Sequence, residues 1–106
     1  MTQATGPLKH VVLFRFKEGT PQATIDHLVD EYRALPTKIE TMKHFEWGVD
    51  VSVENRNEGF THCFITTFDN PAGLEIYLPH PAHVAYVEEL KPHLDGLLVV
   101  DFHPQP

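Results

Sequence analysis

The chain has 106 residues, 42% of them hydrophobic, which is the size of one domain with one modest core. Its 15 acidic and 8 basic side chains give a net charge of −7, which argues against nucleic-acid and anionic-membrane binding because both need a basic surface. Cys63 is the only cysteine, so an intrachain disulfide and a cysteine-based zinc site are excluded.

Both ends of the chain have the composition of tails around a single domain. We predict a flexible tail over residues 1–7, a folded domain over residues 8–103 and a C-terminal tail over residues 104–106. Residues 1–7 lack the basic and apolar regions of a signal peptide. No apolar run approaches the roughly 20 residues that span a bilayer. We therefore expect a cytoplasmic protein with no membrane partner.

The first half of the chain predicts two strands with a helix between them. Residues 8–17 are rich in β-branched and aromatic side chains and apolar on both faces, which predicts a strand that is covered on both sides. Thr20 and Pro21 predict a helix start, with Thr20 as N-cap and Pro21 at the first helical position. Apolar residues at helical spacing follow, and Pro36 ends the run. Residues 43–53 predict the second strand.

The second half predicts a strand followed by an interrupted helix. Residues 54–59 form a polar, hairpin-like turn, and residues 60–68 predict the third strand. Asn70-Pro71 starts a short helical segment, which the prolines of Pro79–Pro81 interrupt. The helix then resumes and is predicted to end near Pro92.

A last strand is predicted over residues 97–102, which completes the order β-α-β-β-α-β. This order is typical of the ferredoxin-like α+β fold with an antiparallel sheet. Such a sheet carries its helices on one face only. Because the other face is also apolar, we expect it to pack against a second copy of the chain, forming a homodimer.

Segments spread over most of the chain resemble those of one protein family. They are Lys9–Phe14, Trp47–Val51, Glu58–His62, Tyr77–Val84 and Asp101–Phe102. In this order, over about residues 8–103, they resemble the stress-responsive A/B-barrel (Dabb) family. The resemblance implies a ferredoxin-like subunit whose sheet packs against that of a partner, giving a dimeric α+β barrel.

The family includes plant stress proteins without established chemistry and a plant polyketide cyclase. Similarity to the cyclase implies that His83 corresponds to the catalytic histidine and Tyr77 to its partner tyrosine. It implies further polar pocket residues at His10, Tyr32 and His62.

These two residue types suit cofactor-free chemistry on a carbonyl compound. A histidine has an ordinary pKa of about 6.5, so it can take a proton alpha to a carbonyl near neutral pH. A tyrosine hydroxyl can donate to the enolate oxygen that forms. The hypothesis is that His83 is the base and Tyr77 the donor. In the alternative interpretation, His83 caps or packs the helix start and Tyr77 fills the core.

A small hydrophobic pocket is predicted between sheet and helices, although the same positions could pack shut. Its apolar lining is predicted at Val12, Phe14, Leu28, Phe64, Leu78, Tyr86, Val87, Leu94 and Val99. The predicted ligand is a small hydrophobic carbonyl compound. Pro79, Tyr86 and Leu94 depart from the cyclase, so its substrate is not carried over.

Other functions find less support in the sequence. His80 and His83 could share a metal ion, but spacing supplies no third ligand, and we predict neither a metal nor a cofactor. There is no glycine-rich phosphate loop and no G-x-S-x-G elbow. Two alternatives from other classes stay open. One is a non-catalytic, stress-related dimeric scaffold or small-ligand-binding protein, and the other is an analogue of the monooxygenases or haem-degrading enzymes that share this architecture.

Overall fold

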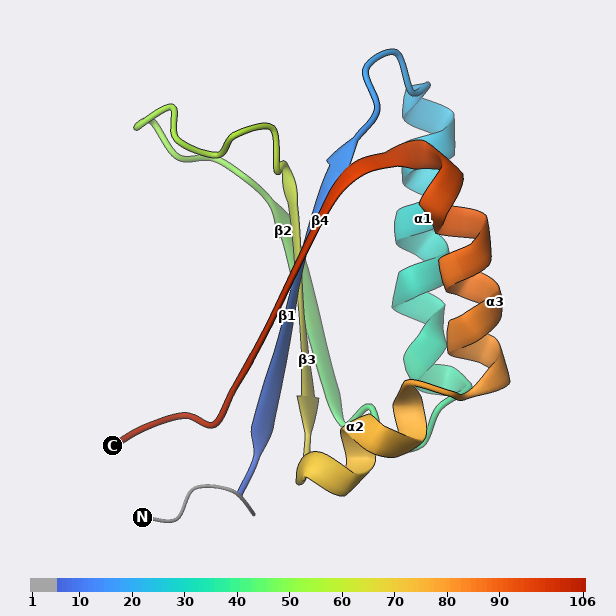
Figure 1. The fold of residues 1–106 in the computed structure, drawn as a ribbon, viewed down its shortest axis with the longest axis vertical. Helices are drawn as coiled ribbons and strands as arrows, with labels where there is room; N and C mark the ends of the chain where they lie inside the picture. The colour runs from blue at the N-terminus through green and yellow to red at the C-terminus, as the bar shows by residue number, and fades with distance from the viewer. Residues whose placement is uncertain (1–5) are drawn as a thin grey trace.

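One antiparallel sheet forms a layer, and the helices lie against one of its faces (Figure 1). The structure is a computed structural model and describes residues 6–106. The elements in chain order are β1 (Leu8–Phe16), α1 (Gln22–Ala34), β2 (His44–Val49), β3 (His62–Phe68), α2 (Pro71–Tyr77), α3 (Pro81–Leu90) and β4 (Leu94–Phe102). The strands lie in the order β2-β3-β1-β4, so the predicted ferredoxin-like α+β fold is confirmed.

The residues that the structure describes at the two ends of the chain can be compared with the predicted tails. Residues 1–5 of the predicted N-terminal tail lie outside the described residues. Gly6 and Pro7 belong to no helix or strand, and neither do residues 104–106. The domain limits at residues 8 and 103 stay a prediction.

The core lies between the helices and the inner face of the sheet. In β1 the even-numbered residues point inward, and Phe14 is buried against Phe64 of β3, with ring centroids 4.6 Å apart. Tyr32 of α1 stacks on Phe64 at 4.5 Å. Burying one such aromatic side chain contributes about 1.5–3 kcal/mol, so this cluster fixes how α1 sits on the sheet.

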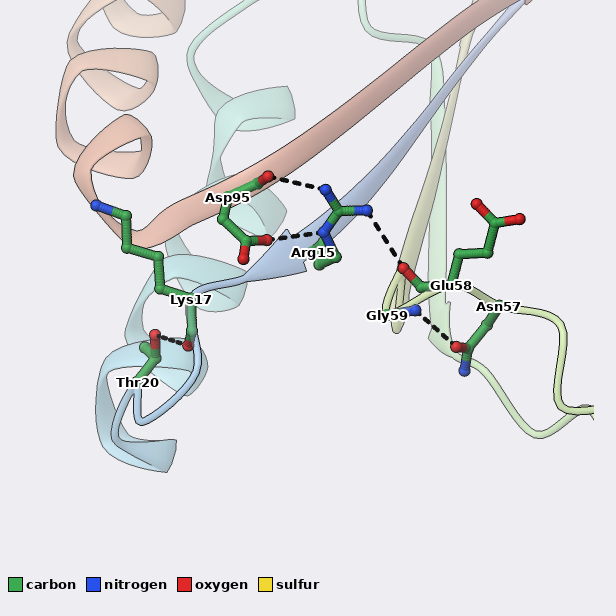
Figure 2. A network of polar contacts seen from close by, with 7 residues as sticks. All are labelled: Arg15, Lys17, Thr20, Asn57, Glu58, Gly59 and Asp95. Atoms are coloured by element: carbon green, nitrogen blue, oxygen red, sulfur yellow. Dashed lines mark hydrogen bonds and ion pairs between the residues drawn. The ribbon is translucent and has the colours of Figure 1, made fainter.

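The start of α1 differs from the prediction. Pro21 occupies the N-cap position, and no side chain caps the helix. The hydroxyl of Thr20 donates instead to the carbonyl oxygen of Lys17, at 2.6 Å (Figure 2). Gly19, with a φ of +85°, closes the tight turn that brings these two groups together. The prediction of Thr20 as N-cap is therefore wrong, because the turn before the helix already uses its hydroxyl.

The loop of residues 50–61 is longer than predicted and extends beyond the sheet on the side away from the helices (Figure 1). β2 ends before Asp50, whose carboxylate accepts hydrogen bonds from the backbone of Ser52 and the amide of Asn57. The amide oxygen of Asn57 accepts from the backbone of Gly59, at 2.8 Å. These local bonds replace strand pairing, so the predicted ends at residues 53 and 60 are wrong.

Arg15 anchors this loop to the start of β4, as Figure 2 shows. Its Nε donates to Asp95 Oδ1 at 2.8 Å and a second nitrogen donates to the backbone oxygen of Asp95 at 3.0 Å. A third contact reaches the carbonyl oxygen of Glu58 at 3.3 Å, and the guanidinium lies 4.6 Å from the ring centre of Phe60. β4 accordingly begins at Leu94, three residues before the predicted start.

The face of the sheet opposite the helices is apolar at its centre. Val11 of β1 pairs with Ile65 of β3 on one side and Val100 of β4 on the other, and Leu13 pairs with Leu98. Val100 is 55% exposed within the single chain. Nothing in residues 6–106 covers this face, which agrees with the expected need for a partner.

None of the helices within residues 6–106 has the length and apolar character needed to cross a bilayer.

Candidate functional site

A cavity of about 270 Å³ opens between α2, α3 and the β1–β4 side of the sheet. Most of the predicted site residues line it: His10, Val12, Phe14, Tyr32, Tyr77, Leu78, His83, Tyr86, Val87, Leu94 and Val99. Leu90, Lys91 and Leu97 also line it and were not predicted. The lining is mostly apolar with a few polar groups, which is the usual composition of a small-molecule site.

Three predicted residues lie elsewhere. Leu28 and Phe64 are fully buried in the core behind the cavity and do not line it. His62 lies at the start of β3, where its ring is parallel to that of Trp47 at 6.3 Å. It borders a second, more open hollow of about 570 Å³, which the loop of residues 50–61 and the opposite face of the sheet enclose.

The break at Pro79–Pro81 positions the two predicted catalytic residues. Asn70 caps α2 by accepting a hydrogen bond from the backbone of Gly73 at 3.2 Å, and Tyr77 is the last residue of this helix. His80 caps α3, because its Nδ1 accepts from the backbone N–H of Ala82 at 3.0 Å. His83 lies in the first turn of α3. The rings of Tyr77 and His83 meet with centroids 4.2 Å apart.

The hydrogen bond of His83 determines which of its ring nitrogens is free. Its Nδ1 lies 2.9 Å from the carbonyl oxygen of Leu78. A carbonyl oxygen can only accept, so Nδ1 carries the proton and Nε2 of the neutral ring keeps its lone pair. Burial lowers the pKa of His83 below its ordinary value, and the nearby His10 and His80 lower it further, against the bond to Leu78. The neutral form of His83 is therefore favoured at pH 7.

Tyr77 is a hydrogen-bond donor across the physiological pH range. Its side chain is 2% exposed, and burial raises the pKa of Tyr77 to about 12. Burial also raises the pKa of Tyr32, well above its ordinary value. The hydroxyl of Tyr86 donates to the backbone oxygen of Leu28 at 2.8 Å, so it is already engaged. Tyr77 is thus a neutral phenol directly beside the histidine.

A second polar pair, which the sequence did not reveal, lies behind Tyr77. His10 is 5% exposed, and its Nδ1 lies 2.6 Å from Asp101 Oδ1. Its ring meets that of Tyr77 edge-on at 5.5 Å. Strand register brings the pair together, because His10 of β1 is the direct partner of Asp101 of β4. The alternation Leu97, Val99, Asp101 along β4 was the signal that could have indicated it.

His80 and His83, the pair considered for a metal ion, have no third ligand beside them in the part of the chain that the structure describes. His80 uses Nδ1 to cap α3, and His83 uses Nδ1 to bind Leu78. No other histidine, cysteine or carboxylate within residues 6–106 completes a three-ligand group around them.

Comparison with known proteins gives a consistent family. Residues 8–104 match the family model described as Stress responsive A/B Barrel Domain. A stress-response A/B barrel domain-containing protein of Arabidopsis thaliana is 43% identical over 104 residues, which are 98% of this chain and 95% of the relative. Olivetolic acid cyclase of Cannabis sativa is 32% identical over 98 residues, which are 92% of this chain and 97% of the cyclase.

Solved structures share the fold over nearly the whole chain. A hydroxynitrile lyase from Passiflora edulis superimposes with a TM-score of 0.89 and 27% identity, covering 95% of both chains. A protein from Jannaschia, described as a dimeric ferredoxin-like protein of unknown function, superimposes with a TM-score of 0.81 and 25% identity. This second match covers 93% of this chain and 100% of the other.

Proposed function

The chain belongs to the stress-responsive A/B-barrel domain family, and from its cavity we propose that it is a cofactor-independent acid/base catalyst acting on a small carbonyl compound. One observation carries the proposal. A neutral His83 with an unprotonated Nε2 stands against the phenol of Tyr77 in a small apolar cavity. A base and a hydrogen-bond donor side by side are what enolate chemistry needs.

The reaction starts with proton transfer to Nε2 of His83 from the carbon next to the carbonyl. The electrons of that C–H bond form the C=C bond of an enolate, and those of the carbonyl π bond move to oxygen. Tyr77 donates a hydrogen bond to this oxygen. In a ring closure the enolate carbon attacks a second carbonyl of the same molecule, a C–C bond forms, and His83 returns its proton to the new alkoxide. A positioned base typically contributes about 10²–10⁴ in rate.

In this scheme His10 and Asp101 are positioning residues. The carboxylate of Asp101 accepts the hydrogen bond from Nδ1 of His10, which fixes the ring edge-on to Tyr77. The ring of Tyr77 is thereby packed between the rings of His10 and His83 at the wall of the cavity. An apolar lining strengthens the hydrogen bond of the phenol to a developing oxyanion.

The chemistry named for two relatives supports a base of this kind. The name olivetolic acid cyclase indicates a ring closure that gives an acid as its product. Cleavage of a hydroxynitrile, the reaction named for the Passiflora protein, takes a proton from a hydroxyl group and leaves a carbonyl compound. Both reactions need one group that accepts a proton and another that stabilises charge on oxygen.

We further propose that two copies pair through the open faces of their sheets into a dimeric α+β barrel. The apolar centre around Val11, Leu98 and Val100 supports this arrangement, as does the Jannaschia neighbour described as dimeric. The cavities lie on the helix side of each sheet, so pairing leaves both copies with a complete site.

Deuterium exchange tests the proposal. Methyl ketones and β-keto esters small enough for the cavity would be incubated with the chain in D₂O, and loss of their α-proton signals followed by NMR. We expect exchange above the buffer rate, reduced about 100-fold by His83→Gln. His44→Gln removes an exposed histidine far from the cavity and should leave the rate unchanged. Ligand binding without exchange would contradict the proposal and favour the small-ligand-binding alternative.

A further inference from the structure

Three side chains with metal-ligand atoms converge on the outer surface of the helix layer, away from the cavity. They are His27 and Glu31 of α1 and Glu89 of α3. We propose that they form a binding site for a divalent transition-metal ion of the zinc class. The site is separate from the proposed chemistry, and it departs from the sequence-based expectation of no metal.

The distances suit a single ion. His27 Nε2 lies 2.8 Å from Glu89 Oε2 and 3.7 Å from Glu31 Oε1, and the three ligand atoms all lie within 4.8 Å of one another. Ligands about 2.0–2.2 Å from a tetrahedral zinc ion lie roughly 3.2–3.6 Å apart. Small rotations of exposed side chains therefore bring all three atoms onto one ion, with a fourth position left to solvent.

The donor set indicates the class of metal. One imidazole nitrogen with two carboxylate oxygens is a borderline ligand set, which Zn²⁺ and its neighbours accept. Mg²⁺ and Ca²⁺ prefer oxygen ligands alone, so the nitrogen of His27 discriminates against them. The two carboxylates belong to different helices, and a cation between them removes their mutual repulsion.

The backbone beneath the cluster is already fixed. His27 and Glu31 are four residues apart on one helix, so they share a face. The hydroxyl of Tyr86 on α3 donates to the carbonyl oxygen of Leu28, the residue after His27, at 2.8 Å. This buried bond holds α1 and α3 in register, so the ligands from the two helices need little reorganisation. A bound ion would add a second link between the helices that form the wall of the cavity.

Calorimetric titration of the chelator-treated chain with Zn²⁺ tests the site. We expect one ion per chain, a rise in the thermal unfolding midpoint with Zn²⁺, and much weaker binding of Mg²⁺. His27→Gln and Glu89→Gln should each weaken binding by about tenfold or more while circular dichroism stays unchanged. His44→Gln is the matched control, because His44 is an exposed histidine 4.0 Å from one carboxylate, Glu46, with no third ligand.

Three results would overturn the assignment. Absence of saturable one-to-one binding would remove the site altogether. Binding that His27→Gln leaves intact would place the ion elsewhere. Equal affinity for Mg²⁺ and Zn²⁺ would mean that the imidazole is not a ligand.

Discussion

At the scale of single residues, the protonation state of His83 controls the proposed reaction. The base must be neutral, and burial holds the pKa of His83 below its ordinary 6.5. As the pH falls, the ring gains a proton and the base is lost. We predict that kcat/KM for exchange falls as the pH decreases, with the midpoint of the fall below pH 6.5, measured as a pH–rate profile. A midpoint at or above pH 6.5 would show that burial does not lower the pKa of His83.

Tyr77→Phe removes one hydroxyl and keeps the packing of the ring. Since that hydroxyl is the proposed donor to the enolate oxygen, we predict a loss of about 10²-fold in the exchange rate with little change in stability. Because burial raises the pKa of Tyr77 to about 12, the wild-type rate should not decline near pH 10, where an ordinary tyrosine ionises. An equal rate in the variant would exclude the hydroxyl from the reaction.

The sequence indicated the proposed pair, Tyr77 and His83, better than the residues around it. Tyr77 and His83 were predicted from a resemblance and from the chemistry of their side chains, and the structure brings their rings together. Leu28 and Phe64 face inward as periodicity predicts, but inward-facing positions divide into cavity lining and filled core, and periodicity does not distinguish these. Asp101 was missed because its contact with His10 joins residues 91 positions apart and depends on strand register.

At the scale of elements, the starts of α1 and α2 can be compared, because each has a polar residue followed by proline. Both Thr20-Pro21 and Asn70-Pro71 have the sequence of a capped helix, yet only Asn70 caps one. We predict that Asn70→Ala lowers the free energy of unfolding by about 1 kcal/mol. Thr20→Ala should cost less than about 0.5 kcal/mol, since it loses only an exposed turn contact. Urea unfolding measures both, and equal losses would contradict the assignment of the caps.

Element order followed from the sequence, whereas element ends did not. Alternating and helical patterns, with prolines at the breaks, predicted the strands and α-helices in the right order, but not the short 3₁₀ helices Leu35–Thr37 and Lys91–His93. The ends of β2, β3 and β4 depended on contacts of single side chains. Asp50 and Asn57 bind the loop backbone, and Arg15 binds Asp95 at the start of β4. The Arg15–Asp95 contact joins residues 80 positions apart, so it forms only after distant segments meet.

At the scale of the whole molecule, the helices cover one face of the sheet and leave the other open. One face carries the core and the cavity, and the other carries Val11, Leu98 and Val100, through which we propose that a second copy binds. We predict that Val100→Lys converts the dimer into monomers in light scattering after size exclusion, because a charge in the paired face is left unsolvated and unpaired.

Val84→Lys is the control for this prediction. Val84 is also a half-exposed valine, at 42%, but it lies on α3 on the helix side. Its substitution should leave the dimer intact. Dimers that survive Val100→Lys, or dissociate equally with Val84→Lys, would place the interface elsewhere.

The most direct test of the central claim is the tautomer of His83, read from ¹⁵N NMR of its ring nitrogens at pH 7. The account predicts a neutral ring with the proton on Nδ1, bound to the carbonyl of Leu78, and an unprotonated Nε2. A ring protonated on Nε2, or an imidazolium at this pH, would contradict it, because His83 would then have no lone pair with which to act as a base.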